Sequence, residues 1–219
     1  MKTKKKRVMK KIALLVLVLL VVSVNNGFSQ VIKLEHGLNF TWMKGEDLYE
    51  KRPTYSVMLG CDYFEHDWFY LSSEIGYVKK GGEDTVYDYS VLQEGEWTRY
   101  GYARRTARLN YLHVNTSFRV KHSFDKVTLY VGVAPTLDFL MRENCDTRFD
   151  DRRYKDEYNS KKVVFGVKPE IGAYYNVDEK LRVMFNLSFM RNITSVGEIK
   201  NNSLDNHTVA LSLGIGYKL

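Results

Sequence analysis

Apolar and polar residues alternate along most of this chain, in eight separate segments. The clearest segment is 209–219, and its apolar face carries Val209, Leu211, Leu213, Ile215 and Tyr217. Its other face carries alanine, serine, glycine and lysine. Because successive side chains of a strand point to opposite sides of the sheet, this pattern predicts a strand with one apolar and one small or polar face.

The same period recurs in seven earlier segments: 34–43, 55–63, 69–79, 110–120, 127–140, 163–175 and 181–191. A soluble barrel also alternates, but it turns its apolar face inward. Here the apolar set ends in aromatic residues at both edges, which is typical of a face that contacts lipid. These aromatic residues are Trp42, Tyr55 and Tyr77 at one edge and Tyr63, Phe69, Tyr175 and Tyr217 at the other.

The connections between segments alternate in length. Short turns at 64–67, 121–126 and 176–179 alternate with longer linkers at 44–52, 80–108, 142–162 and 192–206. Short periplasmic turns and longer outer loops are typical of outer-membrane barrels. We therefore predict an all-β fold: an eight-stranded antiparallel up-and-down transmembrane β-barrel in the outer membrane of a Gram-negative cell, with both barrel termini in the periplasm. Pro135 and Pro169 fall inside two of the strands and predict local bulges there.

Residues 1–29 have the order of a secretory signal peptide: a basic start, a 13-residue apolar run at 12–24 and small residues before Gln30. An uncleaved anchor is the alternative, but a spanning helix needs about 20 apolar residues. The domains are then a signal peptide at 1–29 and a barrel at 30–219.

Residues 1–29 hold seven basic residues and no acid, so they account for the whole formal charge of +7. The mature chain is neutral, and a nucleic-acid partner is not expected.

Ionisable and polar residues occur on the inward face of the expected barrel. We assign to the lumen a polar network of Lys33, Glu35, Asp62, Glu74, His113, Arg119, Asp138, Lys168, Glu170 and Arg182, with Lys218 also pointing inward. Eight strands leave just enough room for side chains, and buried charges are usually paired. The balance of acids and bases therefore favours a sealed, ion-paired lumen over a proton or ion path. A selective pore would show one dominant sign of charge.

The sequence carries no recognised catalytic constellation. Glu74 with Glu170 is a conceivable carboxylate pair and His113 a conceivable base, but each is better explained by the lumen network. The histidines and the two cysteines, Cys61 and Cys145, show no metal-ligand spacing, and no serine-hydrolase, metalloprotease or phosphate-loop motif occurs. We expect no catalytic residues, no metal and no cofactor, and two cysteines that remain unpaired.

The second outer linker is the best candidate for a binding surface. It combines arginines and acids with five aromatic residues, and these are Tyr87, Tyr89, Trp97, Tyr100 and Tyr102. Aromatic and arginine-rich surfaces supply binding hot spots. Strands that continue beyond the membrane are an equally good explanation. The third linker is dense in charges of both signs, which favours a solvated surface over a site for divalent cations or lipopolysaccharide phosphate.

Several strands resemble one known family. The stretches 33–41, 109–120, 129–140 and 213–219 are similar to those of the PorT-like outer-membrane β-barrel domain, the small "porin family" barrels of Gram-negative bacteria. The resemblance covers essentially all of residues 30–219. It implies the barrel fold; one branch of the family takes part in protein secretion across the outer membrane. The chain departs from the family in Leu219, where an aromatic residue is usual, and in Asn115, where proline is frequent.

Together these features predict a non-enzymatic integral outer-membrane protein that acts through its extracellular loops or within an envelope or secretion assembly. The alternatives are an outer-membrane enzyme that modifies lipid or lipopolysaccharide, and a narrow solute pore. The expected partners are outer-membrane lipid and lipopolysaccharide, with a protein partner at the extracellular loops or the periplasmic face. We expect a monomer.

We predict that the mature protein begins at Gln30, because the basic, apolar and small-residue regions of 1–29 occur in the order that signal peptidase recognises. Intact-mass measurement on protein from the cell envelope checks this. A mass that includes residues 1–29 would contradict it and favour the anchor.

Overall fold

The computed structural model describes residues 31–44, 48–93, 96–149, 152–155, 159–199 and 202–219, and it describes side chains outside 86–103, 149–159 and 198–203. The signal peptide predicted at 1–29 lies outside these ranges. No helix in the described ranges is long and apolar enough to cross a membrane.

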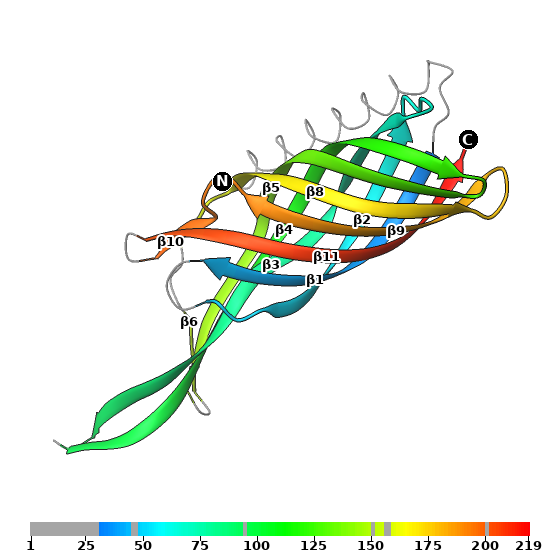
Figure 1. Cartoon of the computed structure of the whole chain (residues 1–219). Helices are drawn as coiled ribbons and strands as arrows, with labels where there is room; N and C mark the ends of the chain where they lie inside the picture. The colour runs from blue at the N-terminus through cyan, green and yellow to red at the C-terminus, as the bar shows by residue number, and fades with distance from the viewer. Residues whose placement is uncertain (1–30, 45–47, 94–95, 150–151, 156–158, 200–201) are drawn as a thin grey trace.

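Eight long antiparallel strands form a closed ring (Figure 1). In ring order they are β1 (Val31–Lys44), β2 (Arg52–Tyr63), β3 (Phe69–Gln93), β4 (Glu96–Phe124), β5 (Val127–Phe149), β8 (Val163–Asn176), β9 (Leu181–Asn192) and β11 (Asn202–Lys218). The ring closes because β1 pairs with β11 from Val31↔Lys218 to Lys44↔Asp205. The predicted eight-stranded up-and-down barrel is confirmed.

The alternation in the sequence becomes an inside and an outside of this ring. In β1 every second residue from Val31 to Met43 is buried, while Leu34, Leu38 and Phe40 between them are exposed. The same pattern runs through β8 and β9. An exposed apolar outer face with a polar interior is the reverse of a soluble barrel and fits a lipid environment.

The two ends of the barrel differ. The end that carries the short connections after β2, β4 and β8, together with Leu219, is called the turn end. The opposite end, where the long connections lie, is called the loop end. Aromatic residues gather on the outer face near both: Trp42, His207 and Phe189 stack at the loop end, and Trp68, Phe69 and Phe118 pack at the turn end.

The segment 80–108, which the sequence predicts as a linker, is formed by two strands. β3 and β4 continue through it as a paired hairpin, with registered partners as far as Gln93↔Glu96. Figure 1 shows this hairpin reaching well beyond the ring. This agrees with the alternative of strands that continue beyond the membrane, and the tyrosines and threonines of the segment favour strand.

The third and fourth linkers also contain strands. β5 runs on to Phe149 and pairs with β6 (Arg152–Lys155), and β10 (Gly197–Ile199) pairs with both β11 and β7 (Asn159–Ser160). Cys145, placed in a loop by the sequence, therefore lies buried in β5. The structure has no disulfide between Cys145 and Cys61.

The bulges predicted at the two prolines are not present. The register between β4 and β5 is the same on both sides of Pro135, although the pairing skips Thr116 and Ser117 opposite it. Pro169 is likewise skipped in the pairing of β8 with β9. Each proline has no backbone N–H to donate, and the missing hydrogen bond is the one toward β4 for Pro135 and toward β9 for Pro169. On their other side the two strands stay paired, as Pro135↔Val167 and Val133↔Pro169. Losing one donor interrupts a ladder without adding a residue, so no bulge is needed.

Candidate functional site

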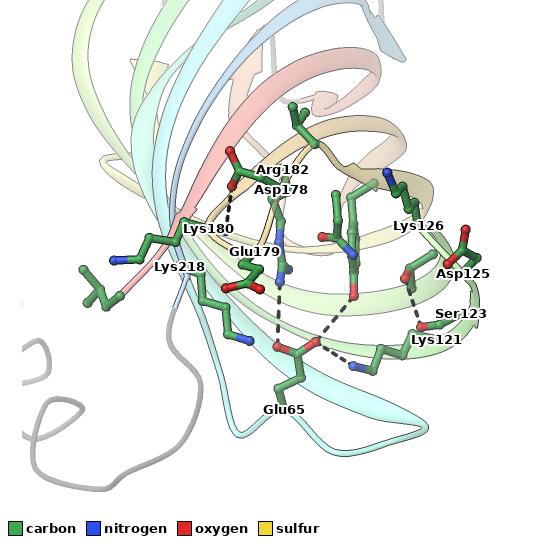
Figure 2. A pocket seen from close by; sticks show the side chains of 15 residues that line it. Glu65, Lys121, Ser123, Asp125, Lys126, Asp178, Glu179, Lys180, Arg182 and Lys218 are labelled. Carbon is green, nitrogen blue, oxygen red and sulfur yellow. Dashed lines mark hydrogen bonds and ion pairs between the residues drawn. The ribbon is translucent and has the colours of Figure 1, made fainter.

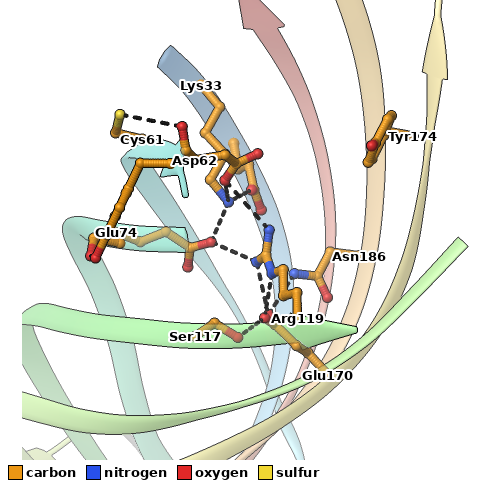
Figure 3. A network of polar contacts seen from close by, with 12 residues as sticks. Lys33, Cys61, Asp62, Glu74, Ser117, Arg119, Glu170, Tyr174 and Asn186 are labelled. Carbon is orange, nitrogen blue, oxygen red and sulfur yellow. Dashed lines mark hydrogen bonds and ion pairs between the residues drawn. The ribbon is translucent and has the colours of Figure 1, made fainter. Parts of the chain in front are cut away.

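An ion-pair cluster crosses the lumen near its middle (Figure 3). Arg119 of β4 lies at its centre, and its Nε is 2.6 Å from Glu170 Oε1 of β8 while its Nη2 is 2.8 Å from Glu74 Oε1 of β3. Lys33 Nζ of β1 lies 2.5 Å from the same Glu74 oxygen, and Lys168 Nζ lies 2.6 Å from Glu74 Oε2. All five side chains are almost fully buried. Three cations thus hold two carboxylates across the full width of the barrel.

Neutral side chains use the hydrogen-bonding capacity that these ions leave. Asn115 Nδ2 donates to Glu74 at 3.0 Å, and Asn186 Nδ2 donates to Glu170 at 2.9 Å. Ser117 donates a short hydrogen bond to Glu170. Lys33 also bonds Glu35 of its own strand, Nζ to Oε1, at 2.7 Å. Buried charge is tolerated when it is paired and hydrogen-bonded in this way.

A second, smaller cluster lies nearer the loop end. Asp138 of β5 accepts from Lys80 Nζ at 2.6 Å and contacts His113 Nδ1 at 2.6 Å. Lys80 of β3 is absent from our predicted lumen set because it was assigned to a linker. The alternation of inward and outward residues in β3 is the signal that could have found it. Val78 and Lys80 continue the inward positions of Ser72 and Glu74.

These contacts bear on the chemical alternatives for the lumen. Glu74 and Glu170 do not form an isolated carboxylate pair, since Arg119 and Lys168 bridge them. His113 is buried against Asp138, and the described side chains that surround it include no nucleophile in hydrogen-bond contact with its Nε2. Ion pairs of this kind hold the charged side chains in fixed positions.

A layer of tyrosines separates these ions from the turn end. Tyr70, Tyr130 and Tyr174 pack edge to face, with centroids 6.0 and 6.4 Å apart, and Arg119 lies 4.7 Å above the Tyr130 ring. Gly172 makes room for the layer, because a Cβ at that position would clash with the Tyr130 hydroxyl. Cations over aromatic faces gain electrostatic stabilisation where water is excluded.

An apolar cap closes the loop end. It consists of buried residues from strand ends and connections: Met43, Leu48, Ala107, Leu109, Tyr111, Cys145, Val164, Val196 and Leu204. Leu48 belongs to the β1–β2 connection, which folds inward because its carbonyl accepts a hydrogen bond from Met43 N at 3.1 Å. The described lumen is therefore filled by apolar groups at this end and by ions at mid-depth.

The turn end opens instead into a cavity of about 860 Å³, here called the turn-end cavity (Figure 2). Its floor is formed by Glu65, Lys121, Tyr174 and Arg182, and its rim by the turns around 125–126 and 177–180 with Lys218. Burial favours a raised pKa for Glu65, but the hydrogen bond and charge of Lys121, with Arg182 and Lys218, lower this pKa below its usual value. Glu65 is therefore ionised at neutral pH.

The structure places the predicted residues as follows. All ten members of the predicted lumen network are buried, and they fall into the two clusters and their margins. Of the five aromatic residues proposed for binding, Tyr87 pairs with Tyr102, Tyr89 with Gly101, Ser90 with Tyr100 and Leu92 with Trp97 in the β3–β4 hairpin. Their side chains lie outside the described set. The turn-end cavity was not predicted, because separate turn residues give no sequence pattern of their own.

No group of three or more histidine, cysteine or acidic residues in the described part of the chain is arranged to hold a metal ion.

Comparison with known proteins points to one family. The family described as "Outer membrane protein beta-barrel domain" matches residues 20–198. The chain is similar to the crystal structure of Neisserial surface protein A, with 12% identity, 89% of this chain and 100% of that chain covered, and a TM-score of 0.51. This likeness shows the shared fold alone. Comparison with curated proteins gives no match.

Two further solved structures are similar at lower TM-scores. One is a major outer membrane protein from Thermus thermophilus, with 13% identity, 87% of this chain and 99% of that chain covered, and a TM-score of 0.48. The other is Ail, the attachment invasion locus protein of Yersinia pestis, with 9% identity, 88% and 99% covered, and a TM-score of 0.47.

We predict that Arg119→Ala lowers the free energy of unfolding by about 3–5 kcal/mol, because it leaves Glu170 and Glu74 buried with fewer partners. Urea unfolding of the barrel in lipid vesicles, followed by tryptophan fluorescence, measures this. Arg191→Ala is the matched control: Arg191 lies exposed at the loop end of β9 and should change stability by less than about 0.5 kcal/mol. Equal effects of both substitutions would show that the central cluster is not what stabilises the lumen.

We predict no steady conductance from the purified protein in planar lipid bilayers. The ion clusters and the apolar cap fill the lumen in series, and eight strands enclose little more than their own side chains. A reproducible ohmic current that scales with the number of inserted barrels would contradict this and favour the narrow solute pore.

Proposed function

The chain belongs to the outer membrane protein β-barrel domain family, and from that membership we propose that it is a non-enzymatic binding protein whose working element is the extracellular β3–β4 hairpin. Its barrel lies in the outer membrane, with the turn end and both barrel termini on the periplasmic side. The loop end therefore faces the outside of the cell.

One observation carries the proposal: β3 and β4 are far longer than a membrane requires. A transmembrane strand needs about 9–11 residues, whereas β3 has 25 and β4 has 29. The segment before β2 contacts β3 through the isolated bridge Glu50↔Glu83. Beyond this bridge, β3 and β4 continue to pair with each other as far as Gln93↔Glu96. Paired strands that extend past the barrel do not serve to span the membrane, so another role must account for them.

The charges and aromatic residues of the hairpin support a binding role. Arg104 Nη2 forms an ion pair with Glu83 Oε1 at 2.9 Å at the base of the hairpin. The registered pairs Tyr87↔Tyr102 and Leu92↔Trp97 bring large residues opposite one another along it. Ordered strands present such groups at a lower entropic cost than a flexible loop does. A protein partner outside the cell is the class of ligand that this extended surface suits.

The lumen supports the non-enzymatic part of the proposal. Its ionisable groups are engaged with one another, and the apolar cap separates them from the extracellular side. An enzyme acting on lipid or lipopolysaccharide would need a reactive group open to the outer leaflet.

The PorT-like resemblance of the strands supports a second candidate, in which the barrel is a component of an envelope or secretion assembly. The matching stretches 109–120 and 129–140 lie in the membrane-spanning parts of β4 and β5. This candidate predicts stable co-purification with other envelope proteins even when the hairpin is absent.

We predict that replacing 87–102 with a short Gly/Ser turn abolishes capture of the extracellular partner while the barrel still folds. Val86 and Ala103 are registered neighbours, so a tight turn joins them without distorting the ladder below. The removed residues pair only with one another, since the pairing of β4 with β5 begins at Ala103, so their loss leaves the ladder of the barrel intact. The measurement is quantitative comparison of proteins that cross-link to intact and shortened barrels on whole cells, with heat-dependent gel mobility as the check on folding.

The control keeps the hairpin backbone and changes only the five aromatic residues to serine. Loss of capture in both variants assigns recognition to the aromatic side chains, and loss in the shortened variant alone assigns it to the strands. Unchanged capture by the shortened barrel would refute the binding role of the hairpin and leave the assembly candidate.

A further inference from the structure

The turn-end cavity contains a buried arginine whose donors are not used. Arg182 of β9 is 6% exposed and lies in the floor of the cavity, with its guanidinium 4.3 Å from the Tyr174 ring. Its two carboxylate neighbours are Asp62 Oδ2 and Glu65 Oε2, and each is 3.8 Å away. That distance is too long for a hydrogen bond. Among the described residues, none accepts a hydrogen bond from this guanidinium.

Of the two carboxylates near Arg182, Glu65 is hydrogen-bonded to another side chain and Asp62 is not. Glu65 Oε1 is bound by Lys121 Nζ at 2.6 Å and lies 3.4 Å from the Tyr174 hydroxyl. Asp62 lies outside the cavity lining and shares its charge among three cations. Lys33 Nζ is 3.6 Å and Arg119 Nη1 3.9 Å from its Oδ1, and neither of its side-chain oxygens accepts a hydrogen bond. The positive charge of Arg182 therefore faces the cavity without a directly bonded anion.

The rest of the cavity floor adds to this positive field. Glu65 is the acid of the floor, and Lys121, Arg182 and Lys218 all lie close enough to act on its charge. At the rim, Asp178 is occupied by its own turn, since its Oδ1 accepts from Lys180 N and Leu181 N at 2.7 Å each. Figure 2 shows Arg182 and Lys218 on the same side of Glu65. The ionisable side chains that line the cavity comprise five bases and four acids, so the bases exceed the acids by one charge.

We propose that the turn-end cavity is a periplasmic binding site for a peptide with a free carboxylate, which accepts hydrogen bonds from the Arg182 guanidinium and is flanked by Lys218. This site is independent of the extracellular hairpin and goes beyond the function proposed above. The fork of an arginine matches a carboxylate with two parallel N–H···O bonds, and the Tyr174 ring beneath the guanidinium holds it in place.

The composition of the cavity favours a peptide over other anionic ligands. Aliphatic side chains are few among the lining residues, with Val177 and Leu219 at its edge, so the cavity offers a lipid chain no continuous aliphatic surface. Asp125 and Glu179 alternate with Lys126 and Lys180 around the rim, and this mixture of signs suits the mixed polar groups of a peptide rather than a polyanion such as a nucleic acid. A volume of about 860 Å³ is also far larger than a single inorganic ion needs.

A singly charged ligand also suits the site better than a phosphate dianion. Glu65 and Asp62 both lie 3.8 Å from the guanidinium, so any anion bound there sits near two carboxylates. The repulsion grows with the charge of the ligand. A carboxylate, with one charge, suffers about half the repulsion of a dianion.

The test is a titration of the folded barrel in detergent micelles, followed by the NMR signals of the Leu181 and Arg182 amides. The probes are N-acetyl-trialanine with a free carboxylate, the same peptide as its C-terminal amide, and inorganic phosphate. The variants are Arg182→Gln, Arg182→Lys and Lys218→Gln, and Arg191→Gln at the far end of β9 is the matched control. Lys218 is exposed, so its substitution does not endanger folding.

We expect saturable binding of the free-carboxylate peptide, with Arg182→Gln weakening it at least about tenfold, as removal of charge-assisted hydrogen bonds does. Arg182→Lys should give an intermediate loss, because it keeps the charge and loses the fork. Lys218→Gln should weaken binding severalfold, and Arg191→Gln should leave it unchanged. The barrel with the shortened hairpin should bind as the intact protein does, which separates this site from the extracellular function.

Three results would overturn the proposal. The first is equal binding of the peptide and its amide, because the carboxylate would then be irrelevant. The second is phosphate binding that is as tight as that of the peptide, which would make the cavity a site for any small anion. The third is a titration that does not saturate at about 10 mM peptide, or that is insensitive to both Arg182→Gln and Lys218→Gln.

Discussion

Closure of the hydrogen-bonded ring between β1 and β11 is the constraint on which everything else in this protein depends. In a lipid bilayer an open strand edge has no water to satisfy it, so the ladder has to return to its first strand. Closing eight strands fixes a narrow interior, and the alternation of side chains delivers half of every strand into it. The chain meets this demand with ions that neutralise one another, above all around Arg119. Each cation is therefore needed where its partner strand brings a carboxylate.

The lengths of the connections make the two ends of the barrel unequal. At the loop end the connections are long enough for Leu48 and Val196 to fold back over the opening, and the result is an apolar cap. At the turn end the connections are too short to fold inward, so the strand ends and their charged turns surround an open cavity. A barrel built in this way presents an ordered hairpin to one compartment and a charged recess to the other. The ion clusters and the apolar cap lie between these two ends.

The sequence was sufficient to predict what depends on period two. Strand number and the inward position of residues such as Glu74 and Arg119 follow from alternation, because a strand offers only two faces. Antiparallel order follows from the connections, which alternate between short and long. Features that depend on how strands meet were beyond it. Lys80 falls in a predicted linker although it continues the inward-facing positions of β3. The sequence leaves both an outer loop and extended strands open for the β3–β4 hairpin, because its alternation is weak. The turn-end cavity joins residues from several separate turns, and no local pattern marks such a meeting.

The two interrupted ladders beside Pro135 and Pro169 have a mechanical consequence. The two prolines lie close to each other across the β5–β8 pair, as the pairings Pro135↔Val167 and Val133↔Pro169 show. The two interruptions therefore lie at the same depth, one on each outer side of this pair. The two strands remain joined to each other throughout, but at that depth they are fastened more weakly to the strands on either side. The hydrogen bonding between strands is therefore not uniform around the barrel: at this depth the β5–β8 pair is attached less firmly to β4 and β9. When the surrounding bilayer deforms the barrel, we expect β4 and β5, and β8 and β9, to be the neighbouring strands that separate first.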